Sequence, residues 1–212
     1  MESKKRIQYL LPGAVIYLAI PLIYMIVGDF QSRTILKEII SLATVGAFFI
    51  LLGQFYLSRA NIVNIKGHKF SKVINLHKVL GYIAIPIIFI HPLLIILPRY
   101  FEASIDLKDA FTLIITNFGS KGIILGIIAM VIMLLIGLLS IFRKHLKIKY
   151  TTWRYIHGYL SLAFIILATW HVVDLGRHMD TFLSTYTIIM ASIGIVFLIR
   201  LYFFNQSRRR NK

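Results

Sequence analysis

Six apolar runs, each long enough to cross a bilayer as a helix, constrain this chain more than any other feature. The hydrocarbon core of a membrane is about 30 Å thick, and a helix crosses it with about 20 apolar residues. Inside it, each backbone N–H and C=O must be hydrogen-bonded within the protein, which helices achieve. We therefore predict an all-α membrane protein, a bundle of six transmembrane helices. The runs are Leu10–Val27, Ile39–Tyr56, Val73–Leu97, Gly122–Phe142, Trp153–Val173 and Phe182–Phe204.

The composition excludes a soluble globular fold. Hydrophobic residues make up 58% of the 212 residues and charged residues only 15%, too few for the polar shell of a soluble protein. The formal charge is +16, from 24 Lys and Arg against 8 Asp and Glu. Because the basic residues lie between the apolar runs and at the chain ends, they indicate membrane topology and contact with anionic lipid rather than nucleic acid.

Basic connections alternate with mixed ones along the chain. By the positive-inside rule, the basic connections and both termini lie in the cytoplasm, which predicts a multi-pass protein of the plasma (bacterial inner) membrane. No small-residue cleavage site follows the basic start of the chain, so we expect an uncleaved first span. No connection is long enough for a further domain, so residues 1–212 are predicted to form one domain without a soluble flavin or nucleotide unit. The basic residues are Lys4, Lys5 and Arg6; Arg59, Lys66, Lys69 and Lys72; Arg143, Lys144, Lys147, Lys149 and Arg154; and Arg208, Arg209, Arg210 and Lys212.

Two of the apolar runs carry histidines at the same spacing. His77 and His91 lie fourteen residues apart in the third run, and His157 and His171 lie fourteen apart in the fifth. Fourteen residues make about 3.9 helical turns and about 21 Å of rise, so the two histidines of each run face one side of their helix within the membrane. Both runs start on the cytoplasmic side, so the helices are parallel. His77 then lies at the depth of His157, and His91 at the depth of His171.

Four imidazoles at two depths indicate two stacked haems. Histidine inside a membrane is costly and normally faces the bundle interior or a partner. Parallel helices can hold one iron between the two imidazoles at each depth, so we predict two haem groups between spans three and five. Such an iron has no open coordination site, which suits electron transfer. Hydrogen bonds to neighbouring helices are the competing explanation, and they account for one histidine more readily than for four. The predicted metal ligands are His77, His91, His157 and His171.

The absence of cysteine narrows the type of haem. With no Cys in the chain, thiolate ligation, covalent C-x-x-C-H attachment and cysteine-ligated iron–sulfur clusters are all excluded. The haems are therefore predicted to be of the non-covalent b type.

Small and aromatic residues lie on the same helix faces as the histidines. A flat macrocycle needs small residues one turn from its ligand, and Gly81 and Ala168 occupy such positions. Phe164 falls midway between the histidines of the fifth run, where it could fill the gap between two porphyrins. Arg154 could pair with propionates of the inner haem, although a role in topology also explains it. Pro86 is expected to kink the third run and rotate His91.

The remaining histidines and one glycine pair favour structural explanations. His68, His145 and His178 fall in loops or at the ends of runs, where a histidine is normally solvated or in contact with headgroups. Gly122 and Gly126 form a Gly-x-x-x-Gly pattern, which is typical of helix packing.

The region from Gln54 to Val173 resembles the ferric reductase-like transmembrane domain. That family is shared by ferric reductases, NADPH oxidases and the haem-binding subunit of bacterial periplasmic methionine sulfoxide reductase. The resemblance implies a six-helix bundle that passes electrons from a cytoplasmic flavin through two b haems to an acceptor outside, such as ferric iron or oxygen. It also implies axial ligation by the four histidines and an aromatic residue between the haems, a role open to Phe164. It rests on LHKVLGY with His77, on His91, on WRYIHGYL with His157, and on His171.

The chain departs from the larger members of that family. It lacks the FAD- and NADPH-binding domain that ferric reductases and NADPH oxidases carry, so FAD or FMN and NAD(P)H are expected to act only through a separate partner. Electrons would come from a separate flavoprotein, from free reduced flavin or from quinol. The resemblance therefore implies a membrane haem subunit of an oxidoreductase, in the lipid bilayer, with a periplasmic protein as a further candidate acceptor.

Two alternatives stay open. One is a quinol-linked haem subunit of a periplasmic reductase, as in the methionine sulfoxide reductase system. The other, from a different class, is a transporter or haem-export protein, although such proteins usually show inverted repeats and broken helices.

Overall fold

The fold is an all-helical bundle. The structure is a computed structural model that describes residues 12–31, 33–57, 70–103 and 120–200, together with positions 106, 108, 109, 112, 116 and 202. Over this part of the chain no β-strand occurs. The elements are a π-helical turn η1 (Val15–Ala19), the helices α2 (Ile20–Val27), α3 (Ile35–Tyr56), α5 (Phe70–Ala103) and α7 (Lys121–Ile141), a 3-10 turn η2 (Phe142–Lys144), and the helices α8 (Tyr150–Leu175) and α9 (Thr181–Ile199).

Five of the described helices are long and apolar enough to cross a membrane, by length and composition. This confirms five of the six predicted spans. The predicted first span corresponds to a shorter apolar helix over Pro12–Val27. The first two residues of that predicted span, Leu10 and Leu11, lie outside the described residues. A sixth crossing and the orientation of the termini therefore stay predictions. The five helices cover Ile35–Tyr56, Lys72–Leu94, Lys121–Lys144, Tyr150–Leu175 and Thr181–Ile199.

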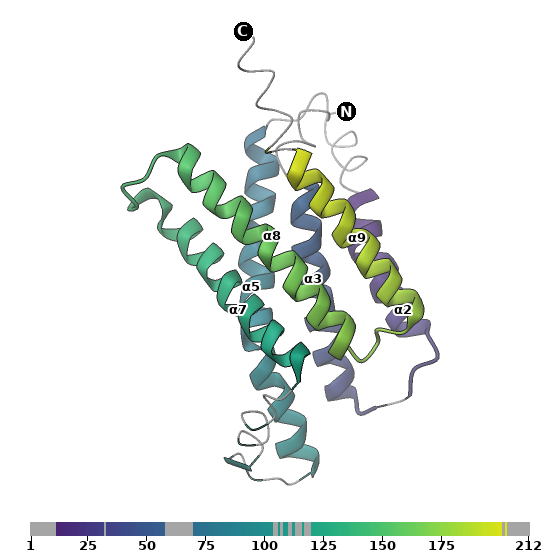
Figure 1. Cartoon of the computed structure of the whole chain (residues 1–212). Helices are drawn as coiled ribbons and strands as arrows, with labels where there is room; N and C mark the ends of the chain where they lie inside the picture. The colour runs from purple at the N-terminus through teal and green to yellow at the C-terminus, as the bar shows by residue number, and fades with distance from the viewer. Residues whose placement is uncertain are drawn as a thin grey trace.

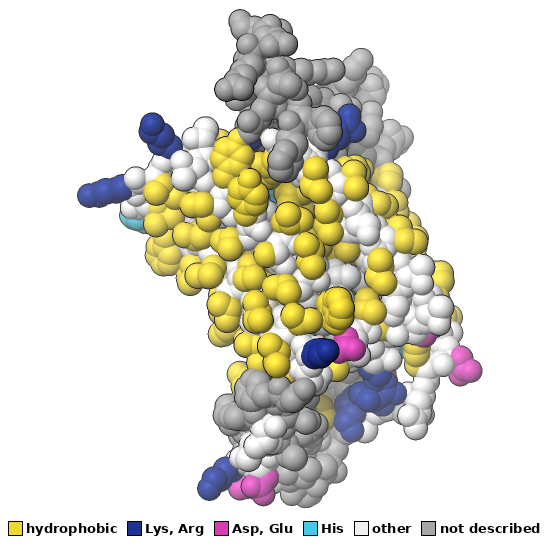
Figure 2. Space-filling view, viewed as in Figure 1, with side chains coloured by type: hydrophobic (Ala, Val, Ile, Leu, Met, Phe, Trp, Pro, Cys, Tyr) yellow, Lys and Arg dark blue, Asp and Glu magenta, His cyan; other side chains and the backbone are white. Residues whose placement is uncertain are grey.

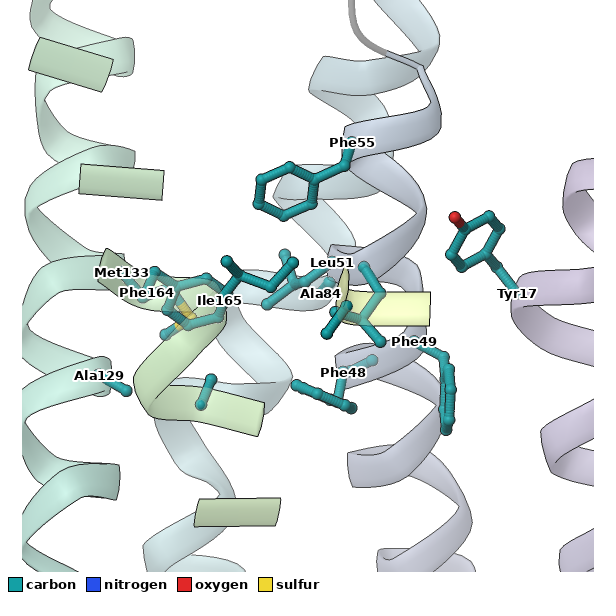
Figure 3. Packing of buried hydrophobic residues seen from close by; sticks show 14 of the residues in the cluster. Tyr17, Phe48, Phe49, Leu51, Phe55, Ala84, Ala129, Met133, Phe164 and Ile165 are labelled. Atoms are coloured by element: carbon teal, nitrogen blue, oxygen red, sulfur yellow. The ribbon is translucent and has the colours of Figure 1, made fainter. Parts of the chain in front are cut away.

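Helix α3 lies at the centre of the bundle. It packs against α5, α9, α2 and η1, while α7 packs along α8. Its middle turns bury Phe49 and Leu52 almost completely, and the core continues into Ala84 of α5 and Ile165 of α8 (Figure 3). In Figure 1, α5 and α8 both run from the upper end of the bundle to the lower end. The predicted parallel direction of spans three and five is therefore confirmed.

The outer surface of the bundle is apolar. Large hydrophobic side chains point outward from every long helix, for example Leu138 of α7, Trp170 of α8 and Val196 of α9. In Figure 2, hydrophobic side chains cover the broad middle of this face, and charged side chains lie toward its two ends. Monomeric soluble proteins seldom expose contiguous apolar areas of this extent, so the surface fits a lipid bilayer.

The connection between α8 and α9 differs from expectation. His178 was expected to be solvated, but it is only 2% exposed. Its Nδ1 lies 3.2 Å from the Ser41 hydroxyl, its Nε2 lies 3.5 Å from a Glu38 carboxylate oxygen, and its ring meets Phe30 edge-on. Burial lowers the pKa of His178, and Glu38 partly opposes this shift. The polar partners come from α3, which is distant in sequence, so the loop position alone gave no sign of burial. His145 is exposed, as expected, and His68 lies outside the described residues.

Asp180 joins two parts of the bundle at the same end. Its carboxylate accepts a hydrogen bond from the backbone N–H of Leu183 at 2.8 Å, which caps α9, and another from the Tyr24 hydroxyl of α2. These bonds, the amide first and the hydroxyl second, hold the pKa of the Asp180 carboxyl below its ordinary value. The acid therefore stabilises the fold in its ionised form.

Replacement of this cap gives a first prediction. Asp180→Ala should lower the free energy of unfolding by about 1 kcal/mol, as other lost helix caps do. Because the folded-state pKa is lowered, the contribution is complete above the ordinary aspartate pKa and disappears as pH falls through the folded-state value. Thermal unfolding of the two proteins in detergent, repeated from neutral to acid pH, measures the difference. Asp29→Ala, an exposed acid at the same end, is the control. An equal midpoint for Asp180→Ala and the parent at neutral pH would contradict the cap.

Candidate functional site

The structure brings the four histidines together in the two predicted pairs. The rings of His77 on α5 and His157 on α8 have centroids 6.4 Å apart, with an interplanar angle of 59°. Those of His91 and His171 lie 6.2 Å apart at 64°. We call these the inner pair and the outer pair. Pro86, Pro92 and Pro98 all lie inside α5, and the helix still presents both histidines to α8.

The spacing of each pair leaves room for one metal ion. A metal–imidazole nitrogen bond is about 2.0–2.1 Å long, and the ring centre lies about 1.1 Å beyond the nitrogen, so two axial imidazoles on one ion have centroids about 6.3 Å apart. Both observed values agree with this figure. In the described part of the chain, no group of three or more His, Asp or Glu side chains could hold a metal ion. Each pair offers two ligands, and haem brings the other four with it.

Hydrogen bonds fix the tautomers of the outer pair. Nδ1 of His91 lies 2.5 Å from the carbonyl oxygen of Ile88, and Nδ1 of His171 lies 2.9 Å from that of Gly122. A carbonyl oxygen only accepts, so each Nδ1 must carry the proton and donate it. Nε2 of each ring is then left with a free lone pair. This is the usual arrangement of metal-bound histidine, in which the second nitrogen is oriented by a backbone carbonyl or carboxylate.

A hydroxyl group fixes the tautomer of His157, one candidate ligand of the inner pair. The Ser140 hydroxyl donates to the carbonyl of Ile136 at 2.7 Å, and its oxygen lies 3.4 Å from Nδ1 of His157. Since its proton is already engaged, Ser140 accepts from the His157 Nδ1–H. Nε2 of His157 is thereby left free as well. Trp153 stacks on the same imidazole, with centroids 5.1 Å apart and an interplanar angle of 27°.

Glycines set the space around the histidines. A Cβ at Gly81, one turn from His77, would meet nothing within 4 Å, so this face of α5 is open as a macrocycle requires. A Cβ at Gly126 of α7 would come within 2.6 Å of Cε1 of His171. Gly126 therefore allows α7 to approach α8 and seat the His171 ring, while Gly122 supplies the carbonyl that orients it. The Gly-x-x-x-Gly pair packs helices, as predicted, and also positions a candidate ligand.

Small and aromatic residues are buried in the region between the two pairs. Ala84 and Phe164 each lie seven residues from both histidines of their own helix, and both are buried. Ala168, one turn before His171, is buried too. Figure 3 shows Phe164 beside Met133 in this part of the core. No ligand is part of the structure, so the roles of Phe164 and Ala168 toward haem stay predictions.

Arg154 retains an unpaired donor. Its Nε is buried without a hydrogen-bond partner among the residues that the structure describes. The guanidinium carbon lies 5.5 Å from the ring centre of Tyr202 and 5.9 Å from that of Tyr155. A buried donor of this kind fits an anionic group such as a haem propionate. Arg154 lies three residues before His157, and its role stays a prediction.

Sequence reasoning missed three of the residues that support the histidines. Ser140 and the His171-seating role of Gly126 depend on contacts between helices, for which one sequence carries no signal. Trp153 did carry one, because it lies four residues before His157 and so on the same helix face.

Comparisons with known proteins show the family of this chain. Residues 42–168, more than half of the chain, match the family described as "Ferric reductase like transmembrane component". The matched region runs from α3 into α8 and includes His77, His91 and His157, and it ends three residues before His171. An uncharacterised protein of Archaeoglobus fulgidus is 37% identical over 166 residues, which are 78% of this chain and 90% of that protein.

The contact between Gly126 and His171 gives a second prediction. Gly126→Val should displace the His171 ring and reduce the haem content of the purified protein from two groups per chain to about one. The pyridine haemochrome assay measures this ratio. Gly137→Val on the same helix is the control, because a Cβ there would lie 3.5 Å or more from its nearest neighbour, Ile85. Two haems per chain in the Gly126 variant would show that haem binding does not depend on the close contact between Gly126 and the His171 ring.

Proposed function

Because the chain belongs to the ferric reductase-like transmembrane family, we propose that it transfers electrons across a membrane through two bis-histidine b haems. The donor is a cytoplasmic reductant, either reduced flavin or a flavoprotein, and the acceptor lies on the other side, with ferric iron or oxygen as examples. The chain then acts as the membrane haem subunit of an oxidoreductase in the plasma (bacterial inner) membrane. One observation carries the proposal: two imidazole pairs at the spacing of axial ligands, with Nε2 free on at least three of the rings.

The histidines and their partners would hold the cofactor. Haem, when bound, supplies an iron centre that gains and loses one electron. His77 with His157, and His91 with His171, would occupy both axial positions and leave none for oxygen. Hydrogen bonds at Nδ1 hold His91, His171 and His157 in the tautomer that binds metal, and they raise the basicity of the free nitrogen.

The surrounding residues would insulate the route. Phe164 and Ala84 are buried between the two pairs and exclude water there. Arg154 would compensate the negative charge of the inner propionates with its buried Nε–H. The basic connections place the inner pair at the cytoplasmic side under the positive-inside rule. Electrons would therefore enter at His77 and His157 and leave beyond His91 and His171.

Removal of single ligands gives a third prediction. His91→Ala or His171→Ala should each leave about one haem per chain, because an iron that loses one of two axial ligands is held weakly. Pyridine haemochrome content and the reduced-minus-oxidised spectrum of purified protein, made with adequate haem supply, measure the result. His145→Ala, an exposed loop histidine, should keep the parental content. The proposal fails if the ligand variants bind as much haem as the parent.

Phe164 gives a fourth prediction. Phe164→Leu should slow the transfer of electrons between the two levels while the haem content stays at two, because it opens a gap in the packed route at limited cost to stability. In proteoliposomes with reduced flavin outside and ferricyanide trapped inside, the rate of ferricyanide loss measures transfer across the membrane. Phe89→Leu on the lipid-facing side of α5 is the matched control, since Phe89 is exposed. Equal rates in the two variants would remove Phe164 from the route.

A further inference from the structure

A stack of aromatic rings leads from the exposed start of α8 to the inner histidine pair. Tyr150 stacks on Trp153 with centroids 5.8 Å apart and an interplanar angle of 18°. Trp153 in turn stacks on His157 at 5.1 Å and 27°. Tyr150 is 44% exposed, whereas Trp153 is partly buried. The stack therefore joins the aqueous end of the bundle to a candidate haem ligand through two ring-to-ring contacts.

The stack is held in place and carries positive charge. The indole N–H of Trp153 donates to the carbonyl of Leu139 at 3.1 Å, which fixes the ring between α7 and α8. The guanidinium of Arg143 lies 4.4 Å from the centre of the Tyr150 ring and 4.9 Å from that of Trp153. Arg143 is exposed, and so are the other cations of this connection, Lys144, Lys147 and Lys149. Figure 2 shows Lys and Arg side chains at this end of the molecule.

Aromatic and basic residues are common at membrane interfaces, where they only anchor a helix. Two features go beyond anchoring. Trp153 turns inward and covers the imidazole of His157, while an anchor faces the headgroups. Tyr150, which is 44% exposed, and the exposed guanidinium of Arg143 also lie side by side. That pair suits a planar aromatic compound with an anionic group, because the ring can pack against the exposed part of Tyr150 and the anion can meet the guanidinium.

We propose that Arg143, Tyr150 and Trp153 form an electron-uptake site for a free reduced flavin nucleotide. The isoalloxazine ring lies against Tyr150, the phosphate meets Arg143, and Trp153 relays electrons to His157. This inference rests on the proposed function and adds the place where the donor binds. Oxidation of one dihydroflavin releases two electrons and two protons (FMNH2 → FMN + 2 e⁻ + 2 H⁺). When haem is bound, each histidine pair would hold an iron centre able to accept one of these electrons, and both protons would pass to cytoplasmic water.

Binding of flavin is the first part of the fifth prediction. Equilibrium dialysis of the haem-loaded protein against FMN, and separately against lumiflavin, which lacks the phosphate, measures affinity without any turnover. Arg143→Gln should weaken FMN binding about tenfold, the usual scale for loss of a charge-assisted phosphate contact, and leave lumiflavin unchanged. Lys144→Gln, the adjacent exposed cation, is the matched control and should bind both as the parent does. The site is wrong if Arg143→Gln binds FMN with parental affinity, or if the parent binds no FMN.

The relay is tested by reduction kinetics. In stopped flow with photoreduced FMN, Trp153→Leu should slow haem reduction about tenfold, because electron transfer weakens steeply when ring contacts are lost. Trp153→Phe keeps an aromatic ring and should retain most of the parental rate. Trp170→Leu, at a lipid-facing tryptophan of the same helix, is the control. Dithionite, a small reductant that needs no stacking surface, should reduce the parent and the Trp153 variants equally fast.

The outcomes separate the two proposals. A parent chain that binds no haem overturns the proposed function. A parent that binds two haems, with Trp153→Leu reduced by FMN at the parental rate, overturns the relay and leaves the proposed function standing. If Trp153→Leu does not fold, the Trp153→Phe variant and the FMN affinity of Arg143→Gln still decide the site.

Discussion

The need to satisfy both ring nitrogens of a histidine inside an apolar bundle governs this structure. An unpaired polar atom in such an environment costs several kcal/mol, so each imidazole requires two partners. For His171 the Nδ1 partner is the carbonyl of Gly122, and it is reachable only because Gly126 has no side chain. The close packing of α7 on α8 follows from that contact. Nε2 is left for a metal ion, for which the 6.2 Å between the ring centres of His91 and His171 leaves room.

The same requirement explains why α5 stands apart from α8. Direct packing of the two helices would leave no space for a macrocycle, whereas α5 packs mainly on α3, and α8 mainly on α7. Helix α9 contacts both α3 and α8, and so links the α3–α5 pair to the α7–α8 pair. Each histidine pair then has the spacing of two ligands on one metal ion.

Features that depend on residues within one helix could be predicted from the sequence, whereas features that depend on contacts between helices could not. The histidine pairs were predictable because helical periodicity fixes the faces of His77 and His91 within one run. The supports for those histidines were not, because Ser140 and Gly126 act from another helix. The burial of His178 was not predicted for the same reason, since its partners Glu38 and Ser41 belong to α3. The first predicted span stays a prediction, because its first two residues lie outside the part of the chain that the structure describes.

The residues along the proposed route determine whether protons cross the membrane together with the electrons. Between the inner and outer pairs, Ala84, Phe164 and Ala168 are buried and have no group that can carry a proton. At the inner end, Trp153 offers a π-system whose indole N–H is already bonded to the carbonyl of Leu139. In the proposed function these residues therefore conduct electrons without an accompanying proton. Protons released by the donor stay in the cytoplasm while electrons move outward. The transfer then separates charge, so a membrane potential negative inside would assist it, and one that builds up positive inside would oppose it.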